Sequence, residues 1–217
     1  MTDWAWGQVD WTLGDMWRVA VGDRWEDYRQ AAVDWNPYGF SLGDPQIPMD
    51  PDTLAQSVFS EDRVYPSVAL TYMGDLWAET FQVRLSYSET AVRPDLREIT
   101  ASSYIDPITG FLTRGNADVR PADVENIDLR AEWFFANSDQ FSITIFDKQI
   151  SGPIEFFETL GSDTTIAREI ENAETASIQG VEVEWLKELG FLGKWADPFF
   201  IQGNFTYQWD REIVIGA

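Results

Sequence analysis

Residues 77–88 read WAETFQVRLSYS, and apolar and polar side chains alternate along most of this stretch. Phe81, Val83, Leu85 and Tyr87 fall on one side of an extended chain, and the polar residues between them fall on the other. A helix would mix apolar and charged residues on one side. The stretch therefore predicts a β-strand with one apolar and one polar face.

The same two-residue period recurs in residues 127–135, 181–185 and 199–209. Read along the whole chain, the pattern predicts eight strands, at about 4–13, 17–31, 63–73, 76–90, 126–136, 141–157, 173–187 and 199–213.

Short and long connectors alternate between these strands. Residues 13–16, 73–76 and 136–140 place Gly, Asp or Asn where a tight hairpin needs them, and a fourth short connector, 190–198, is looser. The others, at about 35–62, 94–125 and 159–172, are long. Transmembrane barrels have short turns on one side and long loops on the other. We therefore predict an all-β fold, an antiparallel up-and-down meander of about eight strands that forms part of a transmembrane β-barrel.

Aromatic residues lie near the ends of the predicted strands, as in the two aromatic girdles of a barrel. We expect one set by the short turns and another toward the long loops: Trp4, Trp6, Trp17, Trp77, Phe135, Phe199 and Phe200 by the turns, and Trp25, Tyr28, Tyr87 and Trp209 toward the loops. The alternative is that they are core aromatics of a soluble β-protein.

Composition restricts the chemistry. The 217 residues include 15 Lys and Arg against 37 Asp and Glu, a net charge of −22, which disfavours nucleic acid as a partner. The chain has no Cys and no His, so thiolate metal sites and histidine-activated nucleophiles are excluded. Glu182 and Glu184 share one strand face, but we interpret them as a wetted wall rather than an acid–base pair. We expect no enzyme activity, no cofactor and no metal site.

Several motifs occur in a characteristic order. Residues 93–98 (RPDLRE), 103–107 (SYIDP) and 114–121 (RGNADVRP) resemble the "RGNPDLKP" region of TonB-dependent receptors. The resemblance extends over roughly residues 64–210, with Ala117 where the family usually has Pro. It continues in NIDLRAEWFF (126–135), FDKQI (146–150), PIE (153–155), NAE (172–174) and GVEVE (180–184).

The resemblance implies a receptor in the outer membrane of a Gram-negative bacterium, with a barrel of roughly 22 strands around a plug domain. We accordingly expect residues 1–217 to be part of one barrel domain, with the plug and the closing strands outside it. The implied partners are outer-membrane lipid, a small-molecule nutrient such as a siderophore or other chelate, the plug of the same full-length chain and, through that plug, the inner-membrane TonB complex.

Candidate ligand contacts lie in the long loops, where exposed aromatic and polar residues are plausible binding groups. They are Trp35, Tyr38, Phe40, Arg114 and Asn116. The alternatives are that the aromatic residues pack against a neighbouring loop, and that arginines such as Arg114 pair with nearby acids.

Two other functions stay open at this point. One is a soluble acidic β-protein that binds carbohydrate through Trp side chains, and the other is a glycosidase that uses carboxylates. The position of the apolar face distinguishes the first from a receptor. A barrel turns Leu85, Leu129, Val183 and Phe205 outward as one belt, whereas a sandwich buries them between two sheets.

Overall fold

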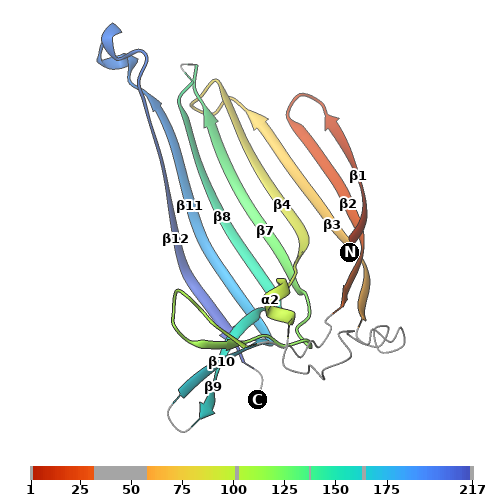
Figure 1. Ribbon diagram of the computed structural model, residues 1–217. Coiled ribbons are helices and arrows are strands. Elements are labelled where there is room, and N and C mark those ends of the chain that lie inside the picture. The colour runs from red at the N-terminus through yellow and green to blue at the C-terminus, as the bar shows by residue number, and fades with distance from the viewer. Residues whose placement is uncertain (1, 32–57, 101–102, 137, 163–164, 216–217) are drawn as a thin grey trace.

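Eight long strands form one antiparallel sheet in the computed structural model, which describes residues 2–31, 58–100, 103–136, 138–162 and 165–215 (Figure 1). Each strand pairs with its neighbours in the order β1-β2-β3-β4-β7-β8-β11-β12. This confirms the predicted meander. The strands are β1 (Thr2–Leu13), β2 (Trp17–Ala31), β3 (Val58–Gly74), β4 (Thr80–Val92), β7 (Ala122–Phe134), β8 (Gln140–Ser151), β11 (Thr175–Glu188) and β12 (Phe200–Val214).

The strand register joins the apolar positions into one continuous belt. A single row of directly paired residues crosses all eight strands and is apolar throughout: Trp11, Val19, Leu70, Leu85, Leu129, Ile145, Val181 and Tyr207. The next row is polar throughout: Thr12, Arg18, Thr71, Arg84, Arg130, Thr144, Glu182 and Thr206. Because neighbouring rows point to opposite sides, the sheet has one apolar and one polar face.

The apolar face is open rather than covered. Leu85 is 50% exposed, Leu129 44% and Phe205 58%, while Val183 is half-buried. A sandwich would bury these side chains, so the alternative of a soluble sandwich is wrong. Among the described residues, no helix is long and apolar enough to span a membrane.

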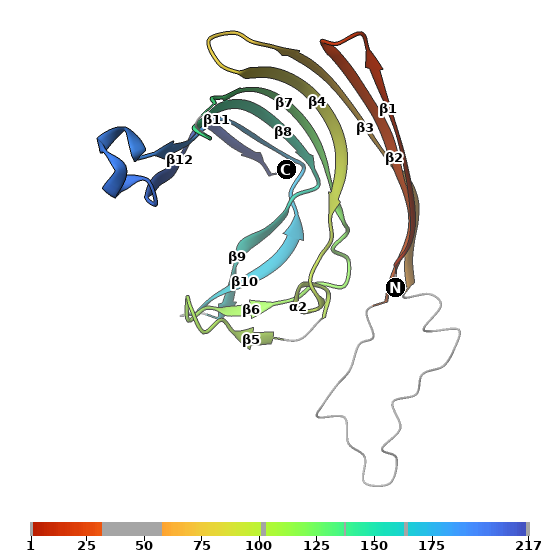
Figure 2. The same cartoon turned by 90° about the horizontal axis from the view of Figure 1, so that it is seen from above.

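The sheet is a curved arc with two free edges. β1 and β12 are the edge strands and do not pair with each other in the part of the chain that is described. Figure 2 shows the strands curving around a space that opens between these edges.

A second, four-stranded sheet lies at the long-loop end (Figures 1 and 2). It has the order β5-β6-β10-β9, and its β6–β10 pair is parallel. The prediction of plain loops at 94–125 and 159–172 is therefore wrong. The elements are α2 (Leu96–Ile99), β5 (Ser103–Ile105), β6 (Leu112–Arg114), β9 (Ile154–Ser162) and β10 (Thr165–Asn172).

This loop-side module, residues 93–121 and 152–173, has a small hydrophobic core. Ile99, Val119 and Ile170 are almost fully buried together, and Ile154 packs against them. The predicted strand 141–157 is broken by Gly152, whose φ of 65° directs the chain away from the main sheet after β8 and into β9.

The predicted position of Trp4 and Trp6 at the short turns needs correction. Trp4 and Trp6 pair with Glu26 and Arg24, far from the turn after Leu13, so they lie toward the long loops and not by the short turns. They also share the polar face, because the apolar residues of β1 have odd numbers. Trp77 does lie at a short turn, with φ of 58°, but the strand predicted from residue 76 begins only at Thr80.

Candidate functional site

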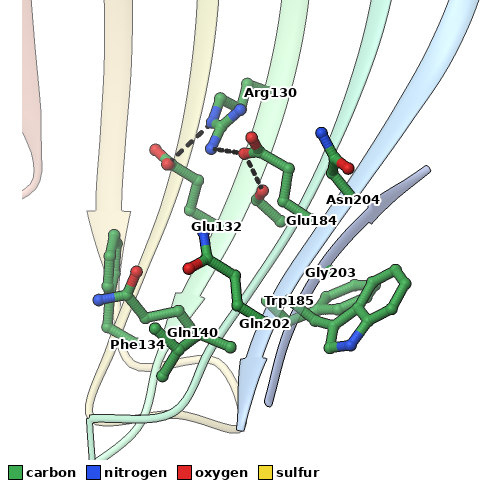
Figure 3. Close-up of a pocket in the computed structure, with 12 residues that line it drawn as sticks. Arg130, Glu132, Phe134, Gln140, Glu184, Trp185, Gln202, Gly203 and Asn204 are labelled. Atoms are coloured by element: carbon green, nitrogen blue, oxygen red, sulfur yellow. Dashed lines mark hydrogen bonds and ion pairs between the residues drawn. The ribbon is translucent and has the colours of Figure 1, made fainter. Parts of the chain in front are cut away.

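An ion-pair network occupies the polar face near the short-turn end (Figure 3). Arg130 on β7 donates from Nε to Glu132 Oε1 at 2.8 Å and from a terminal nitrogen to Glu184 Oε2 at 2.6 Å. Its other terminal nitrogen donates to Thr144 Oγ1 at 3.1 Å. One guanidinium therefore joins three neighbouring strands through all of its nitrogens.

The network continues onto β4 and β8. Gln82 Nε2 donates to Glu132 Oε2 at 2.6 Å, and Ser142 Oγ donates to Glu184 Oε2 at 3.1 Å. These residues fix each other's side chains, which suits a preformed wall. Glu184 is thus engaged by Arg130 and Ser142, which does not suit a free catalytic carboxylate.

Hollows lie along this polar face. The first, of about 420 Å³, is lined by polar groups of the network together with Gln202 and Asn204 of β12 (Figure 3). The second, of about 340 Å³, is lined by Arg18, Thr71 and Arg84 among others. Both present mainly polar side chains, so the curved polar face is a surface for polar contacts.

A second cluster of charges lies on the polar face toward the long loops. Glu26 is buried and is shared by two arginines, Arg24, whose Nε lies 2.9 Å from Glu26 Oε1, and Arg93. Arg24 lies over the Tyr65 ring at 5.2 Å and Arg93 over the Tyr28 ring at 4.6 Å. Burial, and secondly the charge of Arg24, lower the pKa of Arg93.

Trp4 and Trp6 are candidate ligand contacts that the sequence analysis missed. They lie beside this cluster and are 60% and 67% exposed. A hollow of about 220 Å³ is lined by Trp6, Arg24 and Tyr65. Counting back from the tight turn at Gly14 would have placed both indoles at the loop end.

The structure describes two of the five predicted ligand residues, Arg114 and Asn116. Trp35, Tyr38 and Phe40 lie outside the described residues. Arg114 is exposed at the end of β6. The half-buried Asn116 donates its backbone N–H to the Glu98 carbonyl at 2.6 Å, and its side-chain oxygen accepts from the Asp118 N–H at 2.9 Å.

The structure also explains why the motif around Asn116 contains a glycine. A Cβ at Gly115 would lie 2.2 Å from the Thr100 carbonyl oxygen and 2.4 Å from that of Arg97, so only glycine fits there. Farther along, the Asn172 side chain donates to the Arg120 carbonyl at 2.9 Å and to the Gly152 carbonyl at 2.6 Å. These residues therefore hold the loop-side module together.

No group of three or more His, Cys, Asp or Glu that could hold a metal ion occurs among the described residues.

Comparison with known proteins agrees with this architecture. The model of the family described as "TonB dependent receptor-like, beta-barrel" matches residues 1–215. The chain belongs to the TonB-dependent receptor family. This is a family of receptors and transporters of the Gram-negative outer membrane, not of enzymes. No curated protein matches the chain.

Solved TonB-dependent receptors share the fold at low sequence identity. The copper transporter OprC is 13% identical with a TM-score of 0.57, and the match covers 98% of this chain and 30% of OprC. The hemophore receptor HasR of Serratia marcescens is 13% identical with a TM-score of 0.60 (96% and 34% covered). The siderophore receptor PirA of Pseudomonas aeruginosa is 15% identical with a TM-score of 0.56 (98% and 43% covered). The chain thus spans roughly a third of these receptors.

Membership of the TonB-dependent receptor family assigns the two faces of the sheet. In an outer-membrane barrel the apolar belt contacts lipid and the polar face lines the interior. The Arg130 network, the charge cluster around Glu26, and Trp4 and Trp6 beside that cluster all lie on the face that lines the interior in such a barrel.

Proposed function

We propose that this chain is part of the barrel wall of an outer-membrane receptor that binds a scarce nutrient, such as a siderophore or other chelate, and takes it up in an energy-coupled step. The observation that carries the proposal is the two-faced sheet. Its apolar belt continues across every strand, while the opposite, hollowed face carries fixed ion pairs.

The full-length protein is proposed to complete the barrel. Residues 1–217 form one stretch of a single barrel domain, and the plug and closing strands come from other parts of the same chain. The free edges of β1 and β12 support this, because a sheet in lipid must satisfy its edge N–H and C=O groups. The plug would connect the receptor to the inner-membrane TonB complex.

The ligand is proposed to contact the long-loop end of the wall. Trp35, Tyr38, Phe40, Arg114 and Asn116 are the loop candidates, and Trp4 and Trp6 extend the surface onto β1. Aromatic faces would stack on the ligand, and Arg114 would donate hydrogen bonds to anionic groups of a chelate.

Uptake of radiolabelled iron by cells that make the full-length receptor tests the proposal. Iron is offered as a panel of ferric siderophores, and haem is offered separately. We expect the cells to take up one of these compounds, and we expect this uptake to require both the receptor and an intact TonB complex. Binding without TonB-dependent uptake, or uptake of none of the panel, contradicts the proposal of a chelate receptor.

The ligand surface is tested separately by alanine variants of the same receptor. Replacing the five loop candidates together is expected to weaken binding of the transported compound while the barrel still folds, as judged by heat-modifiable gel mobility. Trp4→Ala with Trp6→Ala tests β1, and Trp77→Ala, at the opposite end, is the matched control. Unchanged affinity in the five-site variant removes these loops from the binding site.

A further inference from the structure

The connection between β11 and β12 differs from the other short turns. It contains two 3-10 turns, η1 (Gly190–Leu192) and η2 (Lys194–Ala196), instead of a tight hairpin. It is closed by a hydrogen bond from the Leu189 N–H to the Phe199 carbonyl at 2.9 Å. Gly193, at φ 119° and ψ 164°, joins the two turns in a conformation that other residues rarely adopt. The connection therefore has a defined shape.

The burial of this turn is the reverse of that in a water-soluble loop. The small Ala196 is completely buried, whereas Phe191 is 68% exposed, Leu192 51% and Trp195 71%. The turn is held by its own backbone hydrogen bonds, and these three large side chains are all more than half exposed. Such a concentration of exposed apolar side chains marks an interaction surface.

The surface is continuous with the apolar belt of the barrel. Phe199 and Ile201 lead from the turn onto β12 and are both more than half exposed, and Phe205 and Tyr207 follow on the same face. Figures 1 and 2 show the turn extending past the end of the sheet, outside the space around which the strands curve. A lipid layer around the apolar belt would therefore also reach the turn.

Lysines are also concentrated here. The chain has only three lysines, and Lys187 and Lys194 flank η1. Lys187 Nζ lies 5.3 Å from the centre of the Phe191 ring and also pairs with Asp139. Lysines beside exposed Trp and Phe are typical of a membrane interface, where the stem lies along apolar surface and the ammonium reaches the headgroups.

We propose that the β11–β12 turn is an interfacial anchor whose Phe191, Leu192 and Trp195 insert among the phospholipids of the periplasmic leaflet. Short turns of such barrels face the periplasm, which selects this leaflet. The inference rests on the family's outer-membrane location and not on the nutrient, so it can fail or hold independently of the proposed uptake.

Site-directed spin labelling of the full-length receptor tests the anchor. Trp195→Cys is made in a cysteine-free background, labelled with a nitroxide and reconstituted in phosphatidylethanolamine–phosphatidylglycerol vesicles. Collision with oxygen, which partitions into lipid, is compared with collision with a water-soluble nickel chelate. The expected result is a high oxygen-to-nickel ratio, close to that of a label at Phe205→Cys on the belt.

Asp15→Cys in the β1–β2 turn is the matched control, because it is exposed at the same end of the barrel. A ratio at position 195 as low as at position 15 would place the turn in water and overturn the anchor. Low collision with both reagents would overturn it as well, because the turn would then be packed against protein, such as a neighbouring strand or a second copy. Heat-modifiable gel mobility verifies that each variant is folded.

Discussion

The main sheet and the loop-side module bury apolar side chains in opposite ways. In the module, Ile99, Val119 and Ile170 turn inward and form a core. In the main sheet, the belt residues Leu85 and Leu129 turn outward and stay about half exposed. The difference teaches that the two regions follow opposite burial rules, as the proposed function requires, in which water surrounds the module and lipid surrounds the sheet.

The two regions also differ in what joins their parts. Neighbouring strands of the main sheet follow one another along the chain, and the Arg130 network links them on the polar face. The module joins distant segments, as in the parallel pairing of Leu112 with Ala167. Its stability therefore depends on a small core and on a few hydrogen bonds such as those of Asn172.

The largest expected effect on stability comes from the core of the module, and it tests whether the module unfolds separately from the main sheet. Ile170→Ala removes a core side chain that is 1% exposed, and we expect it to destabilise the module by about 2–5 kcal/mol while the main sheet stays folded. Faster hydrogen exchange of β10 amides with unchanged exchange of β7 and β8 would show this. Ile108→Ala, at a 92% exposed site in the same module, is the control and should change little. Equal loss of protection in both regions would mean that they fold as one unit.

The main sheet is expected to respond to charge. Leu85→Arg places a cation on the lipid face and should cost about 2–4 kcal/mol near the middle of the bilayer, which lowers the amount of folded receptor in the outer membrane. Gln82→Arg, on the opposite face of the same strand, should be milder because its side chain faces the polar interior. Heat-modifiable gel mobility measures both. Similar losses for the two variants would contradict the assignment of the faces.

The Arg130 network should contribute less to the free energy of unfolding than the apolar belt does. Arg130→Met removes the ion pairs to Glu132 and Glu184 and leaves two neighbouring carboxylates, for which we expect a loss of about 1–2 kcal/mol after allowance for partial exposure. Urea unfolding of the receptor in lipid vesicles measures the change. Arg84→Met is the control, since Arg84 lies on the same row but has no ion pair with a described residue. A larger effect at position 84 would refute a special role for the network.

The smallest expected effect is a pH dependence of the stability of the β5–β6 hairpin in the module. The Asp106 side chain accepts the Ile108 N–H at 2.8 Å, and this bond, followed by the hydrogen bond with the Thr109 side chain, lowers the pKa of Asp106 below its ordinary 3.8. Its contribution to the β5–β6 hairpin is therefore complete above that ordinary value and is lost as the pH falls through the lowered pKa. Amide exchange of residues 103–114 between mildly and strongly acidic pH measures the change. Asp106→Asn, which keeps an acceptor, should remove this pH dependence.

The sequence by itself determined the main sheet. Strand periodicity fixed which residues share a face. The tight turn at Gly14 also fixed the register of β1 with β2, whereas the connection predicted at 73–76 is longer, since β4 begins only at Thr80. The family motifs could also be recognised in the sequence. In the structure, Gly115 and Asn116 of the 114–121 motif stabilise the loop-side module.

Only the tertiary structure decided the loop-side module. Its strands are short, its β6–β10 pair joins residues more than fifty positions apart, and neither feature produces a local period that a sequence pattern could display. The same holds for the partners of charged side chains. Arg130 could be placed on the polar face, beside Glu132 of the same strand, by its alternation, but its contacts with Thr144 and Glu184 depend on strand register and on the three-dimensional proximity of neighbouring strands. Periodicity determines which way a side chain points, whereas the fold determines what it meets.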